Sequence, residues 1–162
     1  MVEIKKLPAS RWKVLRDIRL NALQTEPHAF GSSYGEEKSF TQAEWKRRIK
    51  NTLFAFSDEE VAGLIVYLIN SKIKQKHIVN FYGVYVKRAF RNRRIGTKLL
   101  ESAIEIIKRK PGLVKISLQV NPKQTAAVKL YEKHGFKIAG TLKSELLVDN
   151  IFYDEIIMEK FI

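Results

Sequence analysis

The sequence predicts an α/β (α+β) fold, in which a mixed, mostly antiparallel central sheet of about seven strands carries about four helices. Hydrophobic residues recur with the two-residue period of strands in some segments and with the helical period of about 3.6 residues in others, giving the order β-α-α-β-β-β-α-β-α-β-β. The chain has 162 residues, of which 45% are hydrophobic, enough for one sizeable core. Because no repeat, low-complexity tract or linker divides it, we expect a single domain over residues 1–162.

The first third of the chain is predicted as a strand followed by two helices. The strand covers residues 2–6, and Ser10 is the expected N-cap of the first helix. The apolar side of that helix carries Trp12, Leu15, Ile18, Ala22 and Leu23. Residues 26–35 hold proline, glycine and serine among aromatic residues, which indicates an ordered loop. Thr41 followed by Glu44 forms a capping box, so the second helix is expected to begin there.

The rest of the chain begins with strand signals. Two apolar runs, 53–56 and 61–69, flank the polar turn 57–60 and predict a hairpin, with the second run placed centrally because it has little polar alternation. A strand over 78–86 contains Gly83, where a bulge or a close backbone approach is expected. The later elements are a helix over 95–107 ended by Pro111-Gly112, a strand over 114–120, a helix over 123–134 closed by Gly135, and strands over 136–148 and 151–160 joined by Asp149-Asn150.

Composition removes several classes of function. The chain has no cysteine, which excludes a disulfide framework, a thiolate nucleophile and Cys-ligated zinc. His28, His77 and His134 lack the spacing of metal ligands, so we expect no metal. The apolar runs are too short for a membrane span and the N-terminus lacks a secretory signal, so we expect no membrane partner and a cytoplasmic location. The formal charge of +13 favours anionic partners.

The basic turn between residues 86 and 96 is the segment most informative about function. It joins a strand to a helix start, where the first backbone amides have no intrahelical acceptor and the helix dipole adds partial positive charge. Gly96 lets a ligand approach the backbone, so the turn is suited to holding a phosphate. A charge-assisted hydrogen bond contributes roughly 1.5–3 kcal/mol, and several of them would hold a diphosphate at micromolar strength. The Walker and dinucleotide glycine patterns are both absent.

This turn resembles the pyrophosphate-binding motif of the GNAT superfamily of N-acetyltransferases, usually written Arg/Gln-x-x-Gly-x-Gly/Ala. The chain has Arg91-x-x-Arg94-x-Gly96, with Arg94 in place of the first glycine. Residues 119–122 and 126–136 resemble the family's other signature, a strand end with an asparagine and a helix ending in Leu-Tyr-x-x-x-Gly-Phe. The resemblance implies a GNAT-like fold and acetyl-CoA as co-substrate. The residues that it places at the cofactor are Val84, Tyr85, Val86, Arg91, Asn92, Arg93, Arg94, Ile95, Gly96, Thr97, Lys98 and Asn121.

The resemblance also implies roles in the attack of a neutral amine on a thioester. A main-chain amide near Val84 would polarise the carbonyl. Tyr131 would be the general acid for the departing thiolate, the alternative being a tyrosine packed on the core. Asn121 would bind the cofactor or the adjoining backbone, or would be a turn residue. Many relatives carry a strand glutamate where this chain has Asn80, and an amide cannot accept the proton. The remaining candidates for the base are water, Glu36, Glu37 and a C-terminal carboxylate such as Asp154.

The acceptor segment of the family corresponds here to residues 27–34. Phe30, Ser33 and Tyr34 are therefore expected to line the amine pocket, with loop packing as the alternative. We expect a primary amine of a small molecule or peptide as acceptor. The positive charge mildly favours an amino acid, an anionic metabolite or an acidic protein segment over a polyamine. A homodimer also fits the resemblance.

Two rival functions belong to other classes. A non-catalytic acyl-CoA-binding sensor would keep the fold without the chemistry, and the missing glutamate at Asn80 favours it. A basic nucleic-acid-binding module would use the charge of residues 91–94. Because that cluster occupies a strand-to-helix turn and no nucleic-acid-binding motif is present, we expect no nucleic-acid partner.

Overall fold

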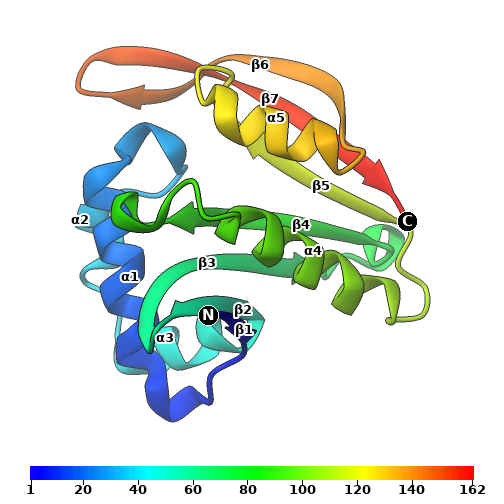
Figure 1. Ribbon diagram of the computed structural model, residues 1–162. Helices are drawn as coiled ribbons and strands as arrows, with labels where there is room; N and C mark the ends of the chain where they lie inside the picture. The colour runs from blue at the N-terminus through cyan, green and yellow to red at the C-terminus, as the bar shows by residue number, and fades with distance from the viewer. The chain divides into compact units, whose positions relative to one another are not determined.

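The computed structural model describes residues 1–162 and contains a seven-stranded mixed sheet (Figure 1). The strand order is β1-β2-β3-β4-β5-β7-β6. The strands are β1 (Val2–Lys5), β2 (Thr52–Ser57), β3 (Glu60–Ile69), β4 (Ile78–Val86), β5 (Lys115–Val120), β6 (Lys137–Val148) and β7 (Ile151–Phe161). The α-helices are α1 (Trp12–Thr25), α2 (Tyr34–Glu37), α3 (Gln42–Arg48), α4 (Ile95–Lys108) and α5 (Thr125–Lys133). Strands β4 and β5 are parallel, whereas the pairs β1–β2, β2–β3, β5–β7 and β6–β7 are antiparallel, which confirms the predicted fold class.

Contacts between residues group the chain into two compact units. Unit 1 comprises Met1–Val66 and Gly83–Glu105, and unit 2 comprises Tyr67–Tyr82 and Ile106–Ile162. Unit 1 therefore holds β1, β2, most of β3, helices α1 to α3, the end of β4 and most of α4. Unit 2 holds the end of β3, the start of β4, the end of α4, β5, α5, β6 and β7.

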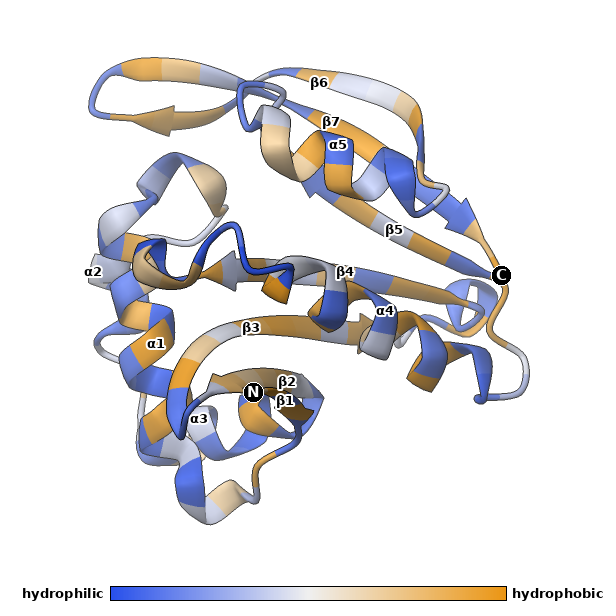
Figure 2. Ribbon diagram, in the orientation of Figure 1, coloured by the Kyte–Doolittle hydropathy of each residue, from blue (hydrophilic) through white to orange (hydrophobic).

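The hairpin of β2 and β3 forms the predicted buried part of the unit 1 sheet. All six residues of β2 are buried, and Figure 2 shows hydrophobic colour along much of both strands. Asp58 and Glu59 join the strands with φ of 49° and 70°, the conformation of a two-residue turn that matches the twist of a hairpin. Gly63 of β3 cannot carry a side chain, because a Cβ there would lie 2.6 Å from the Tyr85 carbonyl oxygen.

Unit 2 confirms the predicted order of its elements. Helix α5 is followed by Gly135, whose φ of 84° is the left-handed conformation expected of a helix C-terminus. Strands β6 and β7 pair in an antiparallel hairpin through Asp149 and Asn150, with φ of 48° and 61°. Strand β7 also pairs with β5, whose Ile116, Leu118 and Val120 are buried as the alternation predicted.

Two predictions about the first helices were wrong. Ser10 is not the N-cap of α1: Pro8 begins a 3₁₀ turn in which the Arg11 N–H bonds to the Pro8 carbonyl oxygen at 2.9 Å. This places Ser10 inside the turn, without the extended backbone of an N-cap. Residues 26–35 are not a plain loop either, because they contain a 3₁₀ turn, Pro27–Ala29, and the start of α2.

A capping box explains the short helix that the prediction missed. The Ser33 hydroxyl accepts a hydrogen bond from the Glu36 N–H at 3.2 Å, and the Glu36 carboxylate accepts one from the Ser33 N–H at 2.8 Å. The same reciprocal pair, correctly predicted, begins α3 at Thr41 and Glu44. The signal for α2 was therefore present in the sequence, three residues apart in both places.

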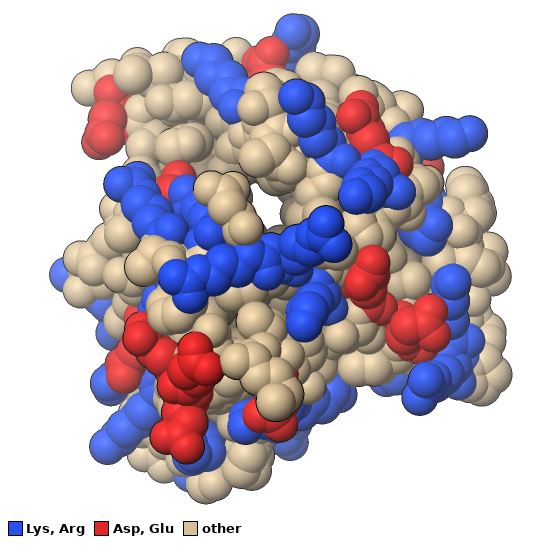
Figure 3. Space-filling view, viewed as in Figure 1, with Lys and Arg blue, Asp and Glu red and all other residues tan.

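Charged residues are spread over the surface rather than confined to one segment. Figure 3 shows Lys and Arg side chains across the face in view, with Asp and Glu among them. Ion pairs such as Lys87–Glu60 and Lys115–Glu159 neutralise part of this charge. No helix has both the length and the apolar character to span a membrane. Nowhere in residues 1–162 do three or more His, Cys, Asp or Glu side chains gather as a metal site would require.

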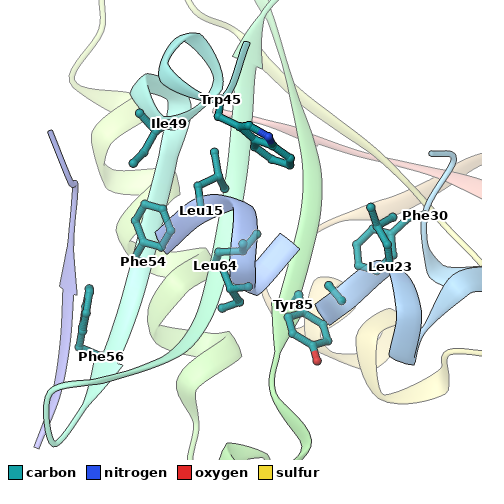
Figure 4. Packing of buried hydrophobic residues seen from close by; sticks show 11 residues of the cluster. Leu15, Leu23, Phe30, Trp45, Ile49, Phe54, Phe56, Leu64 and Tyr85 are labelled. Atoms are coloured by element: carbon teal, nitrogen blue, oxygen red, sulfur yellow. The ribbon is translucent and has the colours of Figure 1, made fainter. Parts of the chain in front are cut away.

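The core of unit 1 joins α1 to the sheet (Figure 4). Helix α1 contributes Leu15, Ile18, Ala22 and Leu23. Figure 4 shows Leu23, Phe30 and Tyr85 together at one end of this cluster, away from Phe56. The Tyr85 hydroxyl donates a hydrogen bond to the Asn21 side-chain oxygen at 2.9 Å and lies 3.1 Å from the Thr25 hydroxyl. The side chain of Tyr85 is thus held by α1.

A buried carboxylate, Glu37, joins the first three helices of unit 1. Its side chain is fully buried and accepts two hydrogen bonds from Arg19, at 2.8 and 3.0 Å. Arg48 lies 3.1 Å from the same carboxylate. Burial would raise the pKa of Glu37, but the hydrogen bonds and charges of the two arginines outweigh it and hold the pKa below its ordinary value. Glu37 is therefore ionised at neutral pH.

Candidate functional site

The end of β4 has an unusual backbone where the sequence predicted one. Gly83 has a φ of 60°, which a side chain would strain. A Cβ at this position would also lie 2.7 Å from Nη1 of Arg19 and 3.8 Å from the Phe30 ring. Both findings confirm the expectation of a close approach at Gly83. They leave the strand without a side chain next to Val84, whose amide is the predicted carbonyl polariser.

The turn after β4 leads into a helix with an open N-terminus. The Lys98 N–H makes the first intrahelical hydrogen bond of α4, to the Arg94 carbonyl oxygen at 3.1 Å. The amides of Ile95, Gly96 and Thr97 precede it and have no intrahelical acceptor. Arg94, just before the helix, has no side-chain oxygen with which to cap them. This helix start offers backbone N–H groups and partial positive charge to an anion.

Arg94 has a backbone conformation that glycine adopts readily. Its φ is 59°, and that of Asn92 is 62°, so both residues are left-handed. Glycine adopts this conformation readily, and asparagine adopts it more easily than most residues. The departure from the family motif at position 94 therefore changes the charge and the strain of the turn, while its backbone conformation is one that glycine prefers.

Replacing Arg94 tests this strain. A left-handed conformation destabilises a non-glycine residue by roughly 1–2 kcal/mol, and the extra freedom of glycine in the unfolded chain offsets about 0.5–1 kcal/mol of that. We expect Arg94→Gly to be more stable than Arg94→Ala by about 0.5–1 kcal/mol. Both variants lose the same charge, so both should bind CoA more weakly than the wild type. Urea unfolding of the pair checks the prediction, and equal stabilities would contradict it.

The cations of the turn divide into two groups. Arg91 donates to the Val86 carbonyl oxygen at 3.1 Å and to Glu26 at 2.9 Å, and Arg88 contacts the same Glu26. Burial would raise the pKa of Glu26, but Arg91 and Arg88 hold it below its ordinary value. Arg91 thus braces the turn against the end of α1. The other predicted cofactor cations, with exposed side chains, are Arg93, Arg94 and Lys98.

Asn121 in unit 2 is a buried polar residue with one unused donor. It is 2% exposed, and its side-chain oxygen accepts a hydrogen bond from the Lys123 N–H at 2.9 Å. Its side-chain nitrogen is buried and has no partner in the protein. A buried donor without an acceptor destabilises by roughly 1–3 kcal/mol, so such groups are rare outside functional positions. Asn121 therefore forms the turn that the sequence allowed, and its unpaired side-chain nitrogen is enclosed by the protein.

Tyr131 on α5 has a buried ring and an unbonded hydroxyl. The ring is 6% exposed and meets Phe136 edge to face, with 5.8 Å between centroids. The hydroxyl makes no hydrogen bond to the protein, yet it is not among the fully enclosed atoms. Burial raises the pKa of Tyr131 far above its ordinary value, so the phenol stays protonated. The Tyr131 ring is packed in the core, as the alternative to a catalytic role predicted. Its hydroxyl also keeps the proton that a general acid requires.

The carboxylates considered as the base are all held ionised by their partners. Hydrogen bonds from Ser33 lower the pKa of Glu36, and hydrogen bonds from Ser144 and Lys143 lower that of Asp154. Glu37 is bound to its two arginines. A carboxylate with a lowered pKa is a weaker proton acceptor, so none of the three has the environment expected of the base.

Glu155 is a carboxylate that the sequence reasoning missed. It is 7% exposed, and burial, followed by the charge of Glu145, raises its pKa. Its neighbour Ile156 pairs with Val120, the last residue of β5 before Asn121. The signal was an acidic residue within the apolar run of β7, next to Asp154, which was the C-terminal carboxylate named as an example among the open candidates. A raised pKa suits a group that exchanges protons near neutral pH.

The three predicted acceptor residues occupy different settings in unit 1. Phe30 is 8% exposed, and its ring meets Tyr85 at 6.4 Å between centroids and lies 4.7 Å from the Arg19 guanidinium. The Ser33 hydroxyl caps α2, and the half-buried Tyr34 ring lies 5.6 Å from the Lys38 ammonium. Phe30 is the member that the structure brings to Gly83 and Arg19.

Comparison with known proteins gives consistent matches. The model of a family described as the acetyltransferase (GNAT) family matches residues 17–136. The chain is 26% identical over 121 residues to the L-amino acid N-acetyltransferase AaaT of Escherichia coli (strain K12). This match covers 72% of this chain and 74% of that protein.

Solved structures have the same fold. The acetyltransferase of the GNAT family from Streptococcus pneumoniae superposes with a TM-score of 0.87 at 25% identity, covering 100% of both chains. The structure of yncA, a putative acetyltransferase from Salmonella typhimurium with its cofactor acetyl-CoA, gives a TM-score of 0.84 at 16% identity, covering 99% of this chain and 94% of that one. At such low identity, the second likeness shows the fold alone.

Proposed function

Because the chain belongs to the acetyltransferase (GNAT) family, an acyltransferase family, we propose that it transfers an acetyl group from acetyl-CoA to a primary amine of a small molecule or peptide by direct attack. The observation that carries this proposal is the open N-terminus of α4, with its uncapped amides and left-handed Arg94. A diphosphate is the kind of group that such a helix start binds. The amino-acid acceptor in the name of the Escherichia coli relative supports an amine as the acyl acceptor.

The proposed roles follow the chemistry of the described residues. The amides of residues 95–97, with Arg93, Arg94 and Lys98, bind the diphosphate of acetyl-CoA, and Asn121 hydrogen-bonds the co-substrate or the adjoining backbone. The backbone of residues 84–86 holds its arm, and an amide near Val84 polarises the thioester carbonyl. As the amine nitrogen bonds to the carbonyl carbon and the C–S bond breaks, the Tyr131 hydroxyl protonates the thiolate, and the proton lost by the amine nitrogen passes through water to the tyrosinate and restores the phenol.

A thermal-shift titration tests the co-substrate. CoA and acetyl-CoA should each raise Tm in a saturable way at physiological salt, since a ligand at about 100 times its Kd stabilises by roughly 2.7 kcal/mol. For a chain of this size, that is a rise of about 5–10 °C. ATP is the control, because it carries phosphates without the pantetheine arm. No shift, or an equal shift with ATP, would reduce the turn to a general anion site and end the proposal.

Two features separate this proposal from the rival functions. A non-catalytic acyl-CoA sensor needs no proton donor, whereas Tyr131 keeps an unbonded, protonated hydroxyl. A nucleic-acid-binding module would use the cations of residues 91–94, and of these Arg91 is paired with Glu26. Release of free thiol from acetyl-CoA in the presence of amines distinguishes the enzyme from both rivals, because neither would produce it.

A further inference from the structure

Arg19 is a buried arginine with one open side. It is 9% exposed, and its Nε and Nη2 donate to the two oxygens of Glu37 at 3.0 and 2.8 Å. The remaining nitrogen, Nη1, makes no hydrogen bond to the protein. It is also not among the fully enclosed polar atoms, so part of its surface is open to solvent. A guanidinium presents its donors in a rigid plane suited to carboxylates.

The open nitrogen lies at the end of β4. Nη1 occupies the space that a side chain at Gly83 would fill, 2.7 Å from the position of a Cβ there. The Phe30 ring lies 3.8 Å from the same position and 4.7 Å from the guanidinium carbon. An aromatic wall restricts water around the donor, and a charge-assisted hydrogen bond is stronger where water is restricted.

The charge around Glu37 also favours an anion. Arg19 and Arg48 share this one carboxylate, so the three side chains carry a net positive charge of one. Arg48 has a side chain that is 37% exposed and is in part hydrated, whereas that of Arg19 is 11% exposed. A buried charge without full compensation is unfavourable unless a counter-charge approaches. The open Nη1 is the place where one can.

We propose that Arg19 binds a carboxylate of the acceptor, and that the acceptor is an amino acid or another amine bearing a carboxylate close to the reacting nitrogen. This deepens the proposed acetyl transfer and rests on it. Gly83 directly precedes Val84, whose amide is proposed to polarise the thioester, and consecutive Cα atoms are about 3.8 Å apart whatever the backbone conformation. That short step matches the separation of carboxylate and amine in an α-amino acid, so the acid held at Arg19 leaves its nitrogen near the carbonyl carbon.

Matched acceptors test the proposal directly. Acetylation of L-phenylalanine and L-leucine is compared with that of phenethylamine and 3-methylbutylamine, which differ only in lacking the carboxylate. One charge-assisted hydrogen bond raises kcat/KM by about 10- to 100-fold. Of the two amino acids, the one with the higher kcat/KM should therefore exceed its matched amine by that factor. Arg19→Met should remove the preference while acetyl-CoA binding is retained. Arg19→Lys, which keeps a charge beside Glu37, should fold and still lose most of the preference, because it has no second nitrogen to present.

The controls separate this inference from the proposed function. Arg16→Met removes an arginine of the same helix that pairs with Asp17 at the surface, and the preference should survive it. Calorimetry with L-phenylalanine and phenethylamine measures carboxylate binding without turnover. The proposal is supported, even if no acetyl is transferred, when the wild type binds L-phenylalanine but not phenethylamine and Arg19→Lys binds neither. Equal use of acids and amines, equal binding of both, or a preference that persists in both Arg19 variants would overturn it. Loss of CoA binding in the wild type would instead count against the proposed function.

Discussion

Tyr131→Phe should lower kcat for acetyl transfer by about 10²- to 10⁴-fold, the contribution typical of a positioned general acid. The substitution removes one oxygen, and the ring keeps its contact with Phe136. Because the hydroxyl makes no hydrogen bond to the protein, its removal leaves no partner unsatisfied and should not lower the stability. Acetyl-CoA binding should therefore be unchanged. Free-thiol release under saturating amine measures kcat, and a thermal-shift titration measures cofactor binding.

Tyr153→Phe is the matched control for this experiment. Tyr153 also lies in unit 2, and its ring contacts the Lys123 ammonium, so a general effect of losing a phenol hydroxyl would appear in both variants.

The dependence of the rate on pH is a second test of Tyr131 as the general acid. Since burial raises the pKa of Tyr131 above its ordinary 10.0, its ionisation should not reduce the rate below pH 10. Unchanged turnover in Tyr131→Phe would exclude Tyr131 as the acid, as would a fall of rate below pH 10 that the variant abolishes.

Glu37→Gln should destabilise unit 1 by roughly 3–5 kcal/mol at pH 7, because removing one partner of a buried ion pair leaves the other charge uncompensated. Two arginines depend on this carboxylate, and Arg19 is itself nearly buried. A neutral amide can keep the shape and one hydrogen bond, but it cannot balance the charge. Urea unfolding at pH 7 measures the loss, and a loss well below 1 kcal/mol would contradict the prediction.

The pH dependence of the same variant gives an independent check. The folded pKa of Glu37 lies below its ordinary value of 4.5, so its contribution is fully present above that pH and is lost as the pH falls through the folded value. The difference in stability between wild type and Glu37→Gln should therefore narrow only in acid, below about pH 4.5. Glu36→Gln, next in the chain but exposed, should show a much smaller loss at pH 7. A constant difference down to acid would show that the carboxylate charge is not the cause.

Elements with strong periodicity or a two-residue turn could be predicted from the sequence. The bounds of β4 agree with the structure, and Gly83, Gly135 and Asp149-Asn150 have the left-handed backbone that their residue types indicated. The N-cap of the first helix was wrongly assigned to Ser10 because Pro8 starts a 3₁₀ turn before that serine. Helix α2 was missed because one turn of helix is too short for a hydrophobic repeat, which left its capping box as its only signal.

In the candidate site, features set by local sequence could be predicted, whereas features set by contacts between distant residues could not. The helix start at residues 95–97 could be predicted because it depends on local backbone chemistry. The pairing of Arg91 with Glu26 could not, because it joins residues 65 positions apart in the chain. The sequence did not single out Glu155. Burial raises the pKa of this carboxylate, and burial depends on strand register rather than on residue type.

The link from α1 to Tyr85 has a consequence for how the protein folds during synthesis. The Tyr85 hydroxyl reaches back 64 positions to Asn21, and the core of unit 1 needs the segment that starts at Gly83. A nascent chain ending at Val66 would carry α1 and β2 with an incomplete apolar surface, exposed to chaperones and to aggregation. At about 5–20 residues per second, this interval lasts seconds on the ribosome. The core of unit 1 closes only after the first segment of unit 2, Tyr67–Tyr82, has already been made.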